Sequence, residues 1–375
     1  MTRSTRWVAA ITTTVAALIT ACAAPSTDLS EGEAGSPTIS QPEVIGGTPT
    51  TAPPVTTRPT STTTPGTLPS TFISENPRMG VGGCPIFPRD NVFGATVTGL
   101  PVRADSDRVI ASMGGTDLGV RPAYTSKTWQ GSRAGLPINI VDSRTTPMKD
   151  VTGGKYGYMS DLEDHPIPSR PRIEGEPNLA WDRHMLIVDS ATCVTSEFFY
   201  VTPPWLNPFG GWVAATAVKL DLNSNTPRKR GTATASGTSM FAGLTLYDEV
   251  AAGEIDHVIG ITIPKIKAGE TIWPATRTDG ASSDPDAPAM GTWLRLRADI
   301  DLSALGPQAR VVAQALKDHG AIVIDTNGSD IALGGEAHDG WDDRDMRTLS
   351  TLNAADFEVI DASPMMISKD SYQIR

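Results

Sequence analysis

The chain has 375 residues, of which 39% are hydrophobic, and carries 42 acidic against 31 basic residues. Its formal net charge of −11 at pH 7 argues against nucleic acid or an anionic lipid surface as the partner, because both present phosphate to whatever binds them. The chain is also long enough to bury a sizeable core.

The first residues are typical of an export signal. Arg3 and Arg6 supply positive charge, and the apolar run that follows is too short to span a bilayer. It ends in Ile19-Thr20-Ala21-Cys22, which resembles the lipobox of bacterial lipoproteins. The resemblance implies cleavage of a signal peptide, residues 1–21, and acylation of Cys22 with diacylglycerol carrying chains such as palmitate. The alternative is an ordinary secretory cleavage after Ala21 or Ala24. We therefore expect a protein anchored at the extracytoplasmic face of the cell membrane.

Residues 22–72 are dominated by Thr, Pro, Ser and Gly and hold almost no large apolar side chain. Such a segment cannot bury enough apolar area to offset the entropy of ordering, so we expect a disordered stalk. With about 50 residues it spans roughly 40 Å as a flexible coil and on the order of 150 Å if stiffened by proline. One globular domain, residues 73–375, is expected to follow it.

Two cysteines remain after lipidation of the third. In an oxidising compartment such a pair usually forms a disulfide, so we expect a Cys84–Cys193 bridge. Neither cysteine has a CxxC partner or a nearby pair of histidines, and the sequence predicts no metal site and no cofactor.

Strands dominate the secondary structure that the sequence predicts. From Leu294 to Ile300 apolar residues alternate with charged ones, which indicates a half-buried strand. Shorter apolar runs bounded by turn residues predict strands at 138–141, 185–188, 198–201, 212–222, 257–263, 321–325 and 357–360.

Two helices are expected. Pro307 starts an amphipathic segment that Gly320 ends, and a shorter helix is predicted at 343–349. The fold class that follows is mainly β (α+β), a single antiparallel β-sandwich-like domain with one or two packed helices.

Titratable residues gather in two places. Asp182 and His184 lead into a strand and share one face by its period of two, so the imidazole could serve as a general base or bind a ligand. Asp248 and Glu249 come shortly before His257, and paired carboxyls of this kind cleave glycans. For each cluster a salt-bridged strand edge or turn is the structural alternative. The candidate catalytic residues are Asp182, His184, Asp248, Glu249 and His257, and the candidate sugar-stacking residues are Trp181, Trp212 and Trp273.

The tetrapeptide Gly237-Thr238-Ser239-Met240 copies the sequence around the nucleophilic serine of subtilases. A subtilase also needs an Asp and a helix-opening His before that serine, on a parallel α/β sheet. Neither the histidine context nor the alternation of strands and helices is present. We interpret the segment as a loop of small residues.

Several short motifs follow one another in an order that resembles a group of secreted bacterial lipoproteins of actinobacterial type, to which no activity is assigned. They are Cys84-Pro85-Ile86-Phe87-Pro88, Asp182-Arg183-His184, Tyr247-Asp248-Glu249-Val250 and Trp273-Pro274-Ala275. The chain departs from that group at Thr276 and Arg277, where relatives carry an aromatic segment with a histidine, and at Phe93-Gly94, where they tend to Trp-Asn.

Two classes of function remain open. One is an enzyme, a hydrolase or lyase of envelope polysaccharide, and the other is a non-catalytic adhesin or receptor for cell-wall glycan. Two carboxyls about 5 to 10 Å apart across an open cleft would favour the enzyme. Side chains buried in the core would speak against it.

Overall fold

The computed structural model describes residues 71–75, 80–129 and 131–375, all within one compact unit. The expected signal peptide, Cys22 and the stalk up to residue 70 lie outside the described residues. Phe72, expected to end the stalk, is only 3% exposed; its backbone N donates to Arg375 O at 2.9 Å, and its carbonyl accepts from Thr96 N at 2.7 Å. The ordered domain therefore includes Phe72. Within the described part of the chain, no helix is long and apolar enough to cross a membrane.

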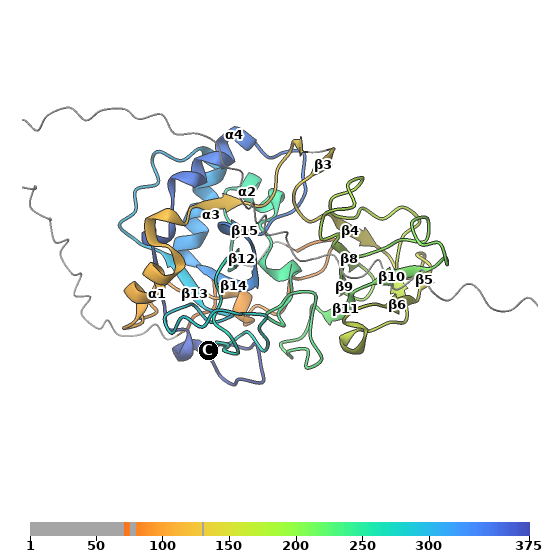
Figure 1. Ribbon diagram of the computed structural model, residues 1–375, viewed down its shortest axis with the longest axis horizontal. Coiled ribbons are helices and arrows are strands. Elements are labelled where there is room, and N and C mark those ends of the chain that lie inside the picture. The colour runs from red at the N-terminus through yellow and green to blue at the C-terminus, as the bar shows by residue number, and fades with distance from the viewer. Residues whose placement is uncertain (1–70, 76–79, 130) are drawn as a thin grey trace, which may run out of the picture. The chain divides into compact units, whose positions relative to one another are not determined.

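The larger sheet has six strands in the order β1-β15-β12-β14-β13-β16 (Figure 1). The β1–β15 and β12–β14 pairs are parallel, and the other three pairs are antiparallel. The strands are β1 (Val120–Pro122), β15 (Ile331–Leu333), β12 (Ile259–Ile263), β14 (Ala321–Thr326), β13 (Trp293–Leu296) and β16 (Phe357–Val359).

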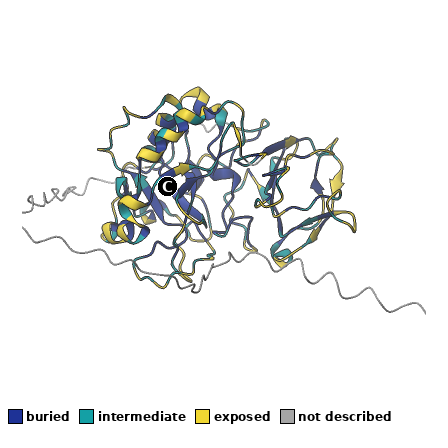
Figure 2. Cartoon of the chain, turned by 45° about the horizontal axis from the view of Figure 1, so that its top comes forward, coloured by how far each residue is buried: buried dark blue, intermediate teal, exposed yellow. Residues whose placement is uncertain are grey.

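Helices cover one face of this sheet. Figure 2 shows them with exposed outer surfaces over buried strands. Alternate strand residues such as Leu294 and Val323 pack with the inner helix residues Val109, Val312 and Leu316 in one apolar core. The helices are α1 (Ser106–Met113), α2 (Tyr247–Ala252), α3 (Pro307–Asp318) and α4 (Asp343–Met346).

A second sheet has four strands in the order β11-β9-β8-β4. The β4–β8 pair is parallel, and the other two pairs are antiparallel. Its strands are β11 (Thr216–Asp221), β9 (Val194–Phe199), β8 (Met185–Asp189) and β4 (Ile138–Val141). Three short ladders complete the described strands: β2 (Thr128–Trp129) with β3 (Ser132–Arg133), β5 (Met148–Lys149) with β7 (His165–Pro166), and β6 (Val151–Gly153) with β10 (Trp212–Ala214).

A shared core lies between the two sheets. Ile322 and Trp293 of the six-stranded sheet pack in the same apolar cluster as Leu186 and Val188 of β8. The opposite face of β8 contributes Met185 and Ile187 to a third cluster. Because side chains alternate along a strand, both faces of β8 are buried, which explains its unbroken apolar sequence.

The β-rich character predicted from the sequence is confirmed. Strands occur at 138–141, 185–189 and 321–326 as expected. The expected strand at 212–222 is two short ones, β10 and β11, and that at 198–201 starts earlier, at Val194. The helix between Pro307 and Gly320 is present, and the one at 343–349 is α4 extended by a 3-10 turn to Thr351.

Other expectations were wrong. The strand expected from Leu294 to Ile300 starts at Trp293 and ends at Leu296, and it has no water-facing side, since Trp293 and Leu294 are both buried. The helices α1 and α2 were not predicted, and four parallel strand pairs accompany the antiparallel ones.

The expected disulfide is confirmed. Cys84 and Cys193 are bonded, with their Cα atoms 5.3 Å apart, and the bond closes a loop across a sequence separation of 109. It ties the amino-terminal part of the domain to the turn between β8 and β9.

Candidate functional site

His184 lies directly before β8 and is held by Glu174, a residue that the sequence analysis did not single out. Glu174 Oε2 lies 2.6 Å from His184 Nδ1 and also accepts the backbone N–H of His184 at 3.1 Å. The backbone N of Glu174 in turn donates to His184 O at 2.8 Å. Both side chains are mostly buried, at 11% and 13% exposure. The imidazole is thus fixed in one orientation, and its Nε2 has no hydrogen-bond partner among the described residues.

The carboxyl groups of Asp182 and Asp325 add negative charge near this imidazole. Asp182 is exposed and stands two residues earlier, as the sequence predicted. Asp325 comes from β14, where it accepts hydrogen bonds from Ala235 N at 3.0 Å and Thr326 N at 2.9 Å. We call Glu174, Asp182, His184 and Asp325 the His184 cluster. Since β8 and β14 belong to different sheets, the cluster lies where the ends of the two sheets come together.

The cluster shifts the protonation of its own members. Burial lowers the pKa of His184, but the charge and hydrogen bond of Glu174, helped by Asp182 and Asp325, outweigh burial and raise that pKa above its usual value. Burial, with a contribution from neighbouring Asp279, raises the pKa of Asp325 to about 6. Partial desolvation also raises the pKa of Asp182, although the residue as a whole stays exposed. A carboxyl with a raised pKa, such as that of Asp325, can hold a proton near neutral pH and donate it as a general acid. Active sites that use acid and base catalysis commonly place such a carboxyl near a second one.

A fully buried carboxyl, Glu197 of β9, pairs in register with Leu186 of β8 and interacts electrostatically with His184. It accepts hydrogen bonds from Ser239 Oγ at 2.5 Å and from the backbone N of Met240 and Phe241 at 3.0 and 3.3 Å. Burial raises the pKa of Glu197 against the effect of these bonds. Ser239 Oγ also accepts from Ala242 N at 3.1 Å. The subtilase-like serine therefore links Glu197 to the backbone of the 3-10 turn Phe241–Gly243, and neither of these hydrogen bonds involves a histidine.

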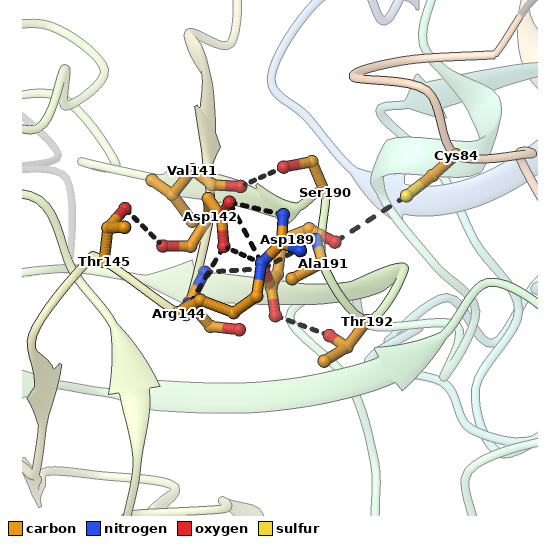
Figure 3. Close-up of polar contacts among 10 residues, drawn as sticks. Cys84, Val141, Asp142, Arg144, Thr145, Asp189, Ser190, Ala191 and Thr192 are labelled. Carbon is orange, nitrogen blue, oxygen red and sulfur yellow. Dashed lines mark hydrogen bonds and ion pairs between the residues drawn. The ribbon is translucent and has the colours of Figure 1, made fainter.

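Asp189 is the last residue of β8, at the end opposite His184, and its side chain binds the turn that follows (Figure 3). Its carboxylate accepts from Ser143 N, Ala191 N and Thr192 Oγ1 at 2.9, 3.1 and 2.5 Å. Desolvation opposes ionisation, but these bonds prevail and hold the pKa of Asp189 below its usual range. The carbonyl of Asp189 lies 3.6 Å from Cys84 Sγ. Asp189 thus fixes the turn beside the disulfide. This turn holds the carboxyl end of β8 in place, and His184 precedes the amino end of the same strand.

The second predicted cluster is divided between surface and core. Asp248 is exposed in the first turn of α2. Glu249 and His257 are 2% and 0% exposed and contact each other, with 2.9 Å between Oε2 and Nε2, while His257 Nδ1 lies 2.9 Å from Val258 O. This buried pair cannot be reached by a polymer, and none of its members is among the charged neighbours of His184. The five candidate residues do not converge in one groove, and we assign Glu249 and His257 a structural role.

The three candidate tryptophans also separate. Trp212 is 7% exposed in the core behind β8, and Trp273 packs against the core between the sheets, where its Nε1 donates to Ser371 O at 3.0 Å. Only Trp181, half-buried and next to Asp182, adjoins the His184 cluster. It lies over Gly175, where an added Cβ would come within 2.3 Å of the Trp181 side chain. Gly175 is therefore required for this packing beside Glu174.

An aromatic residue missed in the sequence analysis lies at the same rim. Tyr200 is 45% exposed, and its backbone N donates to Asp182 O at 3.0 Å. The centroid of its ring lies 6.1 Å from that of the Phe199 ring. The Phe199 centroid in turn lies 5.3 Å from the centroid of the His184 imidazole. Exposed aromatic rings are suited to stacking on sugar.

The hollows of the surface lie elsewhere. One of about 250 Å³ is lined by Ser239, Tyr372 and Arg228, and one of about 380 Å³ lies between the segment 101–105 and Asp361. Neither is lined by His184. Asp182 is the exposed member of the His184 cluster, while His184 and Glu174 are mostly buried.

Among the described residues, no group of three or more His, Cys, Asp or Glu side chains is arranged to hold a metal ion. Comparisons of the chain with protein-family models, curated proteins and solved structures gave no significant match.

Proposed function

We propose that this chain is a lipid-anchored protein of the extracytoplasmic membrane face that hydrolyses an envelope polysaccharide at the His184 cluster. The observation that carries the proposal is the gathering of Glu174, Asp182 and Asp325 around one oriented imidazole at a partly exposed junction. The resemblance to secreted bacterial lipoproteins, the lipid anchor at Cys22 and the wall glycan as partner are parts of the same proposal.

The residues divide the chemistry of glycoside cleavage between them. Asp325, with its pKa of about 6, donates a proton to the glycosidic oxygen. The exposed Asp182 acts as the second carboxyl, which activates water on the other side of the bond. His184 is positioned by Glu174 and donates from Nε2 to a sugar hydroxyl, while Tyr200 and Trp181 provide stacking surfaces. We further propose that the sheets form the sandwich expected from the sequence, which would hold the cluster rigidly.

The test uses the chain with Cys22→Ser, so that the protein is made without acyl groups. It is incubated with purified cell-wall fractions, and reducing sugar ends and pull-down are measured together. Hydrolysis by this protein should fall by about 100-fold or more in Asp325→Asn and in Asp182→Asn, because each removes one partner of the acid and base pair. Asp117→Asn, an exposed carboxyl in the 3-10 turn Gly115–Asp117, is the matched control and should keep full activity.

A second candidate function is glycan binding without cleavage, which the exposed ring of Tyr200 favours. Pull-down without release of sugar would establish it and overturn the hydrolase. Neither pull-down nor release would overturn both.

A further inference from the structure

The loop at residues 203–211, between β9 and β10, presents large apolar side chains to solvent. Trp205, Leu206 and Phe209 are 57%, 41% and 79% exposed. Soluble domains rarely gather exposed apolar side chains without a partner for them. We call this segment the 203–211 loop.

The exposure is built into the loop. Leu206 N and Asn207 N donate to Pro203 O at 3.0 and 3.1 Å, and Asn207 Oδ1 accepts from Phe209 N at 3.1 Å. At the base of the loop, Thr202 and Val213 exchange two backbone hydrogen bonds of 2.8 and 3.0 Å. These bonds hold the apolar side chains outward.

The tryptophan of the loop has a fixed support. The ring of Trp205 stands edge-on to that of the buried Trp212, with 5.5 Å between centroids and 82° between planes. Trp205 therefore remains at the surface on a rigid base, as an interfacial anchor would.

The chemistry of the loop fits lipid better than sugar. From Val201 to Val218 the sequence contains no charged residue and no histidine. The polar side chain of the loop, Asn207, already serves the backbone: its Nδ2 donates to Gly211 O at 3.1 Å and to Gly210 O. A glycan site needs free polar groups to orient hydroxyls, whereas Trp, Leu and Phe without charge suit the boundary between lipid headgroups and acyl chains.

We propose that the 203–211 loop inserts Trp205, Leu206 and Phe209 into the outer surface of the membrane. The location at that membrane rests on the proposed anchor, because a stalk of about 50 residues would have a mean span of roughly 40 Å as a flexible coil and would let the domain reach the bilayer. The apolar contact itself does not depend on the anchor. It is a second attachment that forms without the anchor and that tethering would strengthen.

The experiment uses the whole chain with Cys22→Ser and vesicles of phosphatidylcholine, alone or mixed with phosphatidylglycerol. The protein should co-float with phosphatidylcholine, since the contact is apolar, and less with the mixed vesicles, because its net charge is negative. Lipids brominated along their acyl chains should quench part of its tryptophan fluorescence. Trp205→Ser combined with Phe209→Ser should lower partitioning by at least about tenfold and abolish that quenching. Tyr158→Ser, which removes an aromatic side chain 72% exposed in the 3-10 turn Gly157–Met159, should change neither.

Equal unfolding midpoints for the variants and the parent chain confirm that only the surface has changed. The proposal is overturned if the parent chain does not co-float, or if the double variant partitions as the parent does. It is also overturned if the double variant loses pull-down with wall glycan while vesicles bind neither protein. A natural protein without acyl groups at residue 22 would refute the anchor alone, because the vesicle assay is carried out without it.

Discussion

Two places in this molecule bring a histidine together with carboxyl groups, and their surroundings differ. Glu249 and His257 are sealed in the core, and the imidazole has one carboxyl partner. His184 has Glu174 as partner and further acidic groups nearby, with exposed Asp182 open to solvent. A matched buried pair is costly to break, whereas several carboxyl groups around one imidazole are costly to fold and are typical of functional sites.

The largest effect is expected when the buried pair is broken. His257→Ala leaves the Glu249 carboxyl in the core without its 2.9 Å contact, which should lower the free energy of unfolding by about 3–5 kcal/mol. Glu249→Gln, which keeps a polar partner for the imidazole, should cost less. Urea denaturation measures both, and a loss below about 1 kcal/mol in His257→Ala would contradict the structural role.

Removal of the disulfide should come next. The bridge spans a sequence separation of 109, for which the chain-entropy model gives about 4.8 kcal/mol; since disulfides typically contribute about 2–4 kcal/mol, we expect about 4 kcal/mol. Cys84→Ala with Cys193→Ala should destabilise the fold by about this amount. Because the bridge lies beside Asp189, at the closed end of β8, the double variant should also weaken the alignment of His184 at the other end. Calorimetry and binding of wall glycan, each compared with the intact protein, test the two parts.

The open cluster should make stability depend on pH through Asp325. Its pKa is raised from 3.8 to about 6 in the folded state, so ionisation costs about 3 kcal/mol of folding free energy. This cost is absent below the unfolded pKa and is complete once the pH has passed the folded pKa. In Asp325→Asn the fall in stability between about pH 4 and about pH 7 should flatten, as followed by urea unfolding across that range. An unchanged profile would show that Asp325 ionises normally.

Glu174→Gln removes the negative charge beside His184 and keeps a side chain of the same size that can still bond to the imidazole. The pKa of His184 is raised, so the pair stabilises the fold fully below the unfolded pKa and ceases to do so as the pH rises through the folded pKa. The variant should lose about 1–3 kcal/mol at acidic pH and less at alkaline pH. A loss independent of pH would mean that the pair is held by packing alone.

Sequence reasoning found one half of the candidate site. The spacing of Asp182 and His184 before a strand was informative because side chains two apart in extended backbone share a face. Glu174 and Asp325 come from other segments, and only the tertiary fold brings them to the imidazole. The position of Asp325 after the apolar run Ala321–Ile324 was a usable signal, since ligand sites favour the ends of strands.

The fold was predictable where local chemistry decides it. Pro307 and Gly320 marked the limits of α3, and the φ of +69° at Gly320 requires a glycine there. Two local features also mark α1 over fewer residues. Its apolar residues Val109, Ile110 and Met113 have helical spacing, and Gly114 follows at the end. The parallel pairing of β12 with β14 could not be predicted, because 57 residues separate the two strands and many connections fit that distance.

The smallest change in stability is expected at Asp182. This exposed side chain supports no packing, so Asp182→Asn should alter the free energy of unfolding by no more than about 0.5 kcal/mol. Its negative charge helps to raise the pKa of His184, which should therefore fall in the variant, as a titration of the imidazole by nuclear magnetic resonance would show. Asp117→Asn should leave that titration unchanged. Unchanged stability together with a lowered pKa of His184 would distinguish the His184 cluster from the buried pair, where a change to either side chain is expected to destabilise the fold.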